Sequence, residues 1–141
     1  REGYLAMAGD IFRTAAELVA AIGAIPELRV LGTPFFNVAF TTTAESGLDI
    51  FLVNDFLASQ RWRMNGLQLP PAVHFCVTRP NTQAGVVDRF AADLADAVAY
   101  AREHRGEDAR SGALYAGSVS PEQATSGMAW WLDATQALPP E

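Results

Sequence analysis

The stretch from Leu57 to Thr78 reads LASQRWRMNGLQLPPAVHFCVT and combines the end of a helix with two β-prone segments. Residues 61–69 and 72–78 alternate in polarity well enough to predict two strands. Pro70 and Pro71 lie between them, and we expect both prolines to prevent ladder hydrogen bonding there, because proline has no backbone N–H. The stretch therefore predicts a hairpin-like strand pair, preceded by a helix that ends near Gln60.

Upstream of this stretch, apolar residues at three- and four-residue spacing predict a long amphipathic helix over residues 3–24. Residues 28–31 and 35–41 predict two further strands, joined by a turn that contains glycine and proline. Asp49 is suited to the N-cap of a second helix. Its expected buried side consists of Ile50, Val53, Phe56 and Leu57.

Downstream, Thr82 is the predicted cap of a third long helix, and residues 102–110 read as a solvated loop. The buried side of that helix should carry Val86, Phe90, Leu94, Val98 and Ala101. Ser120 followed by proline predicts the start of a last helix that runs to about residue 137.

This order of elements predicts an α+β fold. The paired strands follow each other too closely for parallel crossovers, so we expect a small antiparallel or mixed sheet of about four strands with helices on one face. A chain of 141 residues is the right size for one domain, and we treat residues 1–141 as a single small domain.

Composition limits the functional classes. The net charge of −6 argues against a nucleic-acid surface, which needs clustered positive charge. Cys76 is the only cysteine, so no internal disulfide can form, and we expect a reducing, cytoplasmic environment. The sequence contains no run of about eighteen apolar residues, so it does not predict a membrane-spanning helix.

Two separated motifs carry a family resemblance. The first consists of Trp62, Asn65, Leu67, Gln68, Pro70, Pro71, His74, Phe75, Cys76 and Thr78, and the second of Gly112, Ala113, Leu114, Tyr115 and Gly117. From about Tyr4 to Leu138 the chain resembles the small C-terminal domain of sphingosine-1-phosphate lyases, which are pyridoxal-phosphate enzymes of fold type I in the group II decarboxylase family. The resemblance implies a homodimer and a large cofactor-binding domain, upstream in the same protein, against which this domain packs.

The resemblance does not extend to a catalytic lysine. All ten basic residues are arginine, so this chain cannot form an internal aldimine with pyridoxal phosphate. We therefore assign no catalytic residue to it and expect the large domain to hold the cofactor. The implied reaction cleaves a phosphorylated sphingoid base to a fatty aldehyde and phosphoethanolamine, and the chain should be inactive alone.

Two residues are candidates for substrate binding. Tyr115 lies among small residues, at 111–118, that let backbone approach a ligand closely, and its phenol can hydrogen-bond a phosphate. The alternative is a packing anchor. Arg79 follows the histidine-containing strand and could bind a phosphate or carboxylate, although most arginines are simply surface residues. The residues after Thr78 also depart from the family's usual run.

Other features have structural interpretations. His74 and Cys76 face the same side of a strand, but two ligands are too few for a zinc site, so we expect a buried cysteine and a hydrogen-bonded histidine. Arg61 and Arg63 should form a solvated face beside a buried Trp62. Trp130 and Trp131 suggest an apolar face that the large domain covers.

Two alternatives to the lyase remain open. One is the small domain of a related pyridoxal-phosphate amino-acid decarboxylase, which would share the architecture. The other is a binding or assembly module without catalysis. The arginine-only, alanine-rich composition suggests a bacterial source.

Overall fold

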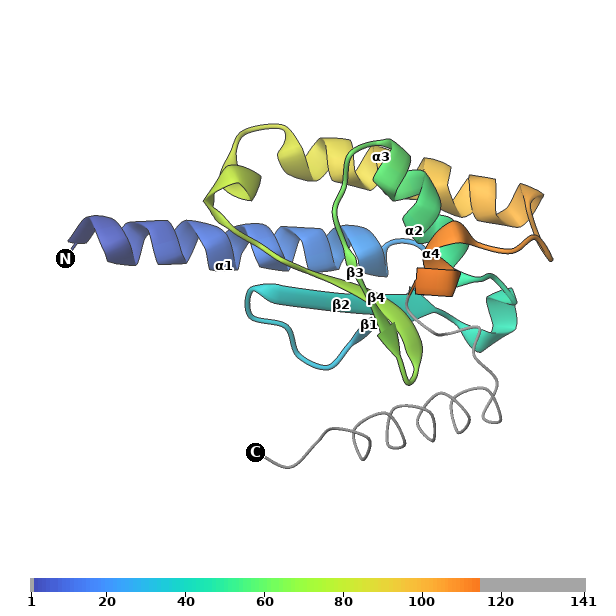
Figure 1. Cartoon of the computed structure of the whole chain (residues 1–141). Helices are drawn as coiled ribbons and strands as arrows, with labels where there is room; N and C mark the ends of the chain where they lie inside the picture. The colour runs from blue at the N-terminus through green and yellow to red at the C-terminus, as the bar shows by residue number, and fades with distance from the viewer. Residues whose placement is uncertain (1, 115–141) are drawn as a thin grey trace, which may run out of the picture.

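The computed structural model describes residues 2–114. In this part the elements are α1 (Glu2–Gly23), β1 (Leu28–Leu31), β2 (Asn37–Thr42), the 3-10 turn η1 (Ala44–Ser46), α2 (Ile50–Ser59), β3 (Asn65–Gln68), β4 (Pro71–Cys76), the 3-10 turn η2 (Arg79–Thr82), α3 (Val86–Glu103) and α4 (Arg110–Leu114) (Figure 1). The helix predicted from Ser120 lies outside the described residues.

The four strands form one antiparallel sheet in the order β1-β2-β4-β3. This confirms the predicted α+β class and makes the sheet fully antiparallel. In the central pair, Val38 lies opposite Phe75 and Phe40 opposite Val73, so four apolar side chains face the same side. Each of these four is buried, which places the core on that face of the sheet.

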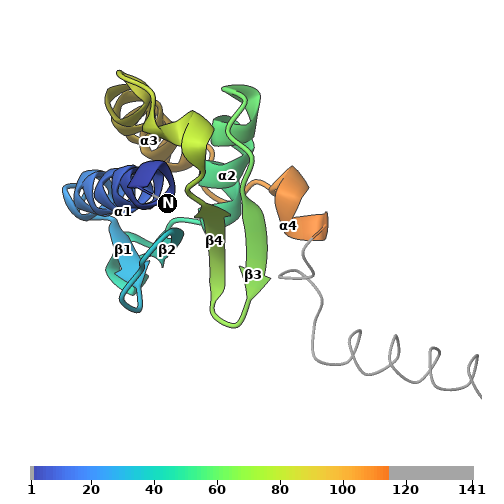
Figure 2. The ribbon, with the colours of Figure 1, turned by 90° about the vertical axis from the view of Figure 1, so that its left-hand side faces the viewer.

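Helices cover this face of the sheet. Figure 2 shows α1, α2 and α3 on one side of the strands, and α3 also packs against α1 and α2. Phe90 of α3 is completely buried, and its ring meets Trp62 at 5.2 Å and Phe75 at 5.6 Å between centroids. Burying a side chain of this size contributes about 2–3 kcal/mol to folding, so the three rings tie α3 to the sheet and to the end of α2.

The start of α3 differs from the prediction. Gly85, at φ +80°, is the N-cap, and Thr82 is not. The Thr82 hydroxyl instead donates a 2.8 Å hydrogen bond to the Arg79 carbonyl and so closes η2. Only a residue that tolerates positive φ can turn the chain from η2 into α3 at this point, and glycine does so without strain.

The hairpin of β3 and β4 is confirmed, but its ends differ from the prediction. Strand β3 begins at Asn65, because the backbone N–H groups of Arg61 and Trp62 bond to Ala58 and Leu57 at the end of α2. Pro71 is the first residue of β4 and lies opposite Gln68, so the expectation that it would interrupt the ladder was wrong. Proline is compatible with the first position of a strand.

Candidate functional site

Arg79 is the first residue of η2, and Val77 and Thr78 separate it from the end of β4. The turn is closed by its own side chains: Thr78 donates from its backbone N–H and its hydroxyl to the Asn81 side-chain oxygen, at 2.8 and 2.9 Å. Asn81 in turn donates its backbone N–H to the Thr78 carbonyl. These bonds hold the backbone on both sides of Arg79, so its long side chain projects from a fixed point.

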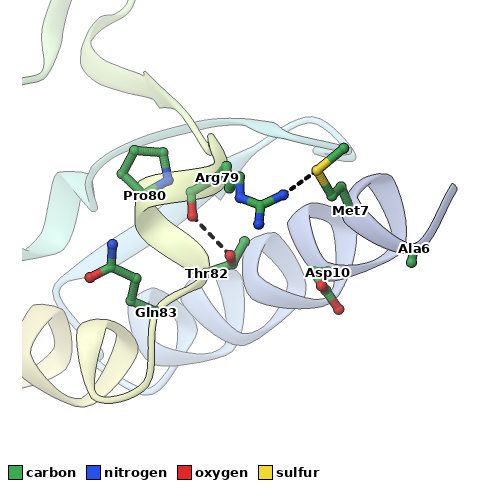
Figure 3. A pocket seen from close by; sticks show the side chains of 7 residues that line it. All are labelled: Ala6, Met7, Asp10, Arg79, Pro80, Thr82 and Gln83. Carbon is green, nitrogen blue, oxygen red and sulfur yellow. Dashed lines mark hydrogen bonds between the residues drawn. The ribbon is translucent and has the colours of Figure 1, made fainter. Parts of the chain in front are cut away.

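The Arg79 side chain lies in a hollow of about 490 Å³ between η2 and the first half of α1 (Figure 3). The lining residues are Ala6, Met7, Asp10, Arg79, Pro80, Thr82 and Gln83. The guanidinium points to α1 and bonds to the Met7 sulfur, while the Asp10 carboxylate pairs with Arg13 one turn along the helix. Within residues 2–114 Arg79 therefore has no carboxylate partner. A thioether is a weak acceptor that a phosphate or carboxylate would readily replace.

Tyr115, the other predicted substrate contact, lies outside the described residues. The segment before it, residues 110–114, is the short helix α4, which the sequence did not predict. The loop predicted at 102–110 overlaps the end of α3 at Glu103 and the first residue of α4. Asp55 of α2 accepts hydrogen bonds from the Arg110 and Ser111 backbone N–H groups at 2.6 and 2.9 Å, and the Ser111 hydroxyl donates to the Phe51 carbonyl. Helix α4 is thus fixed to α2, whereas Arg79 contacts α1.

His74 and Cys76 both face away from the helices. The His74 Nδ1 atom lies 3.0 Å from the Asn37 side-chain oxygen, so the predicted hydrogen-bonded histidine is confirmed. The prediction of a buried Cys76 was wrong: its side chain is exposed, because α1, α2 and α3 cover only the opposite face, where Phe75 and Val77 lie. Among residues 2–114 no three histidine, cysteine or acidic side chains come together as metal ligands.

The residues of this chain do not fit covalent attachment of pyridoxal phosphate. No lysine occurs among the 141 residues, so no side chain of this chain can form the imine that anchors the cofactor. The charged group that this chain provides for a ligand is the guanidinium of Arg79, which lies between α1 and η2. No helix within residues 2–114 is long and apolar enough to cross a membrane.

Comparisons with known proteins identify relatives. No protein-family model matches the chain. Its sequence is 39% identical to sphingosine-1-phosphate lyase of Arabidopsis thaliana over 106 residues, which are 74% of this chain and 19% of the relative. It is 32% identical to the Drosophila melanogaster sphingosine-1-phosphate lyase over 75% of this chain and 19% of that protein. The chain therefore spans about a fifth of the length of these curated relatives.

Solved structures agree with the sequence relatives. The structure of a Burkholderia pseudomallei sphingosine-1-phosphate lyase matches 99% of this chain and 27% of its own, with a TM-score of 0.70 and 45% identity. A C-DES mutant, solved with glycine covalently linked to its PLP cofactor, matches 62% of this chain with a TM-score of 0.52 and 21% identity. The second likeness shows that the fold also occurs in a different PLP protein.

Proposed function

We propose, from the premise that this chain is homologous to a segment of sphingosine-1-phosphate lyases, that it forms the small C-terminal domain of a pyridoxal-phosphate-dependent carbon–carbon lyase. The observation that carries the proposal is 45% identity to the Burkholderia pseudomallei enzyme over 99% of this chain. The reaction would convert a phosphorylated sphingoid base to a fatty aldehyde and phosphoethanolamine. The cofactor would be held by a large domain of the same protein, since this chain has no lysine.

The large domain would pack on the first half of α1. Tyr4, Leu5 and Phe12 on that helix, together with Phe35 and Phe36 in the β1–β2 loop, leave large apolar side chains in solvent, with exposed fractions between 46% and 75%. Phe12 and Phe35 meet edge to face at 6.1 Å between ring centroids, so α1 and the loop form one apolar patch. Soluble domains rarely leave such a patch uncovered, which supports a partner at this position.

Arg79 would then lie at the boundary between the two domains. Ala6, Met7 and Asp10, which line its hollow, belong to the same half of α1 as the apolar patch. Ligand sites commonly form where two domains meet, because each domain supplies one wall. In this position the Arg79 guanidinium would bind the substrate phosphate and orient the chain to be cleaved, and Tyr115 is a second proposed contact.

The test uses the full-length enzyme and the Arg79→Gln variant. Loss of one charge-assisted hydrogen bond to the phosphate should raise KM for the phosphorylated sphingoid base about tenfold and change kcat less. Arg29→Gln, another exposed arginine, is the matched control and should leave KM unchanged. An unchanged KM in Arg79→Gln would remove Arg79 from the substrate site while leaving the lyase assignment in place.

The same preparation separates the reaction classes. Fatty aldehyde release from the phosphorylated sphingoid base supports the lyase, whereas carbon dioxide release from an amino acid would make the protein a decarboxylase. The fold itself cannot distinguish them. Absence of both activities in the full-length protein would support a binding or assembly module. We also propose a homodimer in the cytoplasm, which sedimentation and cell fractionation would test.

A further inference from the structure

A larger hollow, of about 1240 Å³, lies between the end of α2, the start of β3, α3 and α4. Three of its lining residues are arginines: Arg61 and Arg63 lie in the segment between α2 and β3, and Arg110 begins α4. We call the hollow around these three arginines the basic groove. The sequence pattern predicts only a solvated face for Arg61 and Arg63. Both are exposed as predicted, but they precede β3 and do not lie in it, and α4 brings Arg110 to the same hollow.

The three guanidinium groups of the basic groove make no ion pair or hydrogen bond within residues 2–114. Other arginines of the chain do have acidic partners: Arg13 pairs with Asp10, Arg89 with Asp93, and Arg102 with Glu27. One carboxylate, that of Asp55, lies in the same hollow, but both of its oxygens accept backbone N–H groups of α4. A chain with a net charge of −6 thus gathers three arginines around one hollow, and none of them has a partner in the described part of the chain.

The backbone at Arg61 provides a second, independent observation. Arg61 has φ +70°, and within residues 2–114 it is the one residue other than glycine with positive φ. It occupies the left-handed position that ends α2: its N–H bonds to the Ala58 carbonyl, and the Trp62 N–H bonds to the Leu57 carbonyl. Glycine is the usual residue here because a Cβ is strained at this φ. Strained residues of this kind are concentrated at functional sites.

We propose that the basic groove binds the phosphomonoester group of a ligand. A guanidinium matches phosphate oxygens through two parallel hydrogen bonds, and a phosphomonoester carries nearly two negative charges near neutral pH. The positive charge of these three arginines matches the charge of such a dianion better than that of a ligand with one carboxylate group. The half-buried rings of Phe56 and Tyr100, 5.5 Å apart, line the same hollow and leave an apolar wall beside the charges.

This inference does not rest on the proposed lyase function. Arg79 lies in a different hollow, between α1 and η2, and none of its lining residues belongs to the basic groove. Turnover assays on the full-length enzyme and phosphate binding by this chain can therefore fail separately. The phosphate could belong to a soluble metabolite or to a lipid headgroup, and the experiment has one arm for each source.

In the soluble arm, the 141-residue chain labelled with ¹⁵N is titrated with inorganic phosphate and with glycerol 3-phosphate, against sodium chloride of equal ionic strength. The proposal expects phosphate-dependent shifts of the Arg61, Arg63 and Arg110 Nε–H signals. Arg63→Gln and Arg110→Gln should each weaken binding about fivefold, the upper range for one exposed ion pair. Arg29→Gln, outside the hollow, should bind as the wild type does.

Arg61→Gly gives the clearest variant, because it removes the guanidinium and relieves the strained backbone in one step. It should weaken phosphate binding about fivefold while the chain stays folded. Phosphate shifts that map elsewhere, or binding that is unchanged in Arg61→Gly and in the Arg63→Gln/Arg110→Gln double variant, would overturn the proposal.

In the lipid arm, the chain is sedimented with phosphatidylcholine vesicles with and without phosphatidic acid. Binding that requires phosphatidic acid and the three arginines, without groove shifts from the soluble compounds, assigns the groove to a lipid headgroup. Groove shifts from glycerol 3-phosphate without vesicle binding assign it to a soluble phosphomonoester. Failure of both arms would refute a phosphate site at this position.

Discussion

Glu27 connects the beginning of the sheet with the end of α3 through its contact with Arg102. The hydrogen bond from the Arg102 guanidinium is the main reason that the pKa of Glu27 lies below its ordinary value of 4.5. Its own backbone N–H lowers the pKa further, and partial burial opposes both. Because the folded state favours the charged carboxylate, this residue stabilises the fold only while it is ionised.

The first prediction concerns acid stability. A lowered pKa in the folded state gives a contribution that is present above the unfolded pKa and is lost as pH falls through the folded value. Glu27→Gln should therefore lower the free energy of unfolding by up to about 1 kcal/mol at neutral pH, since Arg102 is half exposed. The difference from the wild type should shrink as pH falls below about 4.5. Urea unfolding at several pH values measures it.

Glu17→Gln provides the control for this experiment. Glu17 is exposed on α1 and forms no ion pair within the described part of the chain. Its substitution should change stability little at any pH. A Glu27→Gln deficit that stays constant from neutral pH to strong acid would show that charge on Glu27 contributes nothing.

Among the elements, α2 has a residue with a defined capping role at each end. Asp49 accepts a 2.8 Å hydrogen bond from the Phe51 backbone N–H, which confirms its predicted role as N-cap. At the other end, the left-handed Arg61 directs the chain away from the helix so that Trp62 returns to the core. Between them, Asp55 caps the separate helix α4, which therefore depends on α2 for its position.

The second prediction is that Asp55→Ala releases α4 without unfolding the domain. Two backbone N–H groups of a five-residue helix would lose their acceptor, and such a short helix is not stable alone. Hydrogen exchange at Arg110 and Ser111 should accelerate roughly tenfold, corresponding to the loss of about 1–1.5 kcal/mol. Amides in α3 should keep their protection.

Asp49→Ala is the comparison variant at the element scale. It removes the cap of α2, a core helix, so it should lower global stability by about 1 kcal/mol and leave the relative protection of α4 unchanged. If the Arg110 and Ser111 amides of the Asp55→Ala variant exchanged as slowly as those of the wild type, the Asp55 carboxylate could not be what fixes α4.

At the scale of the whole molecule, the surface is uneven. The first half of α1 and the β1–β2 loop carry the apolar patch, the hollow beside η2 carries Arg79, and the hollow between α2 and α4 carries the basic groove. The surface is therefore not uniformly polar. The apolar patch is the feature that we propose the large domain covers.

The third prediction is that the isolated chain binds an apolar fluorescent dye through this patch. Phe12→Ser and Phe35→Ser together should reduce dye fluorescence severalfold, because they remove the ring pair at the centre of the patch. Leu69→Ser is the control: Leu69 is 95% exposed at the tip of the hairpin, away from the patch residues. Equal dye binding by the wild type, the Phe12→Ser/Phe35→Ser variant and the Leu69→Ser variant would show that the patch is not the surface that binds the dye.

The sequence by itself determined most of the local elements and indicated the relatives of the chain. Apolar spacing predicted α1, α2 and α3, and the alternating polarity of residues 61–69 and 72–78 predicted the hairpin. The motif around Trp62 and His74 indicated the relatives that the comparisons then identified. These features are local, because periodicity, turn residues and capping depend on neighbours within a few positions along the chain.

Only the tertiary structure decided which residues meet. Cys76 is exposed because helices cover one face of the sheet only, and periodicity shows that two faces exist without showing which is covered. Gly85 replaces Thr82 as the cap because η2 uses the Thr82 hydroxyl. Arg61, Arg63 and Arg110 gather because α4 is fixed to α2 by Asp55, a contact across 55 positions that no local pattern encodes.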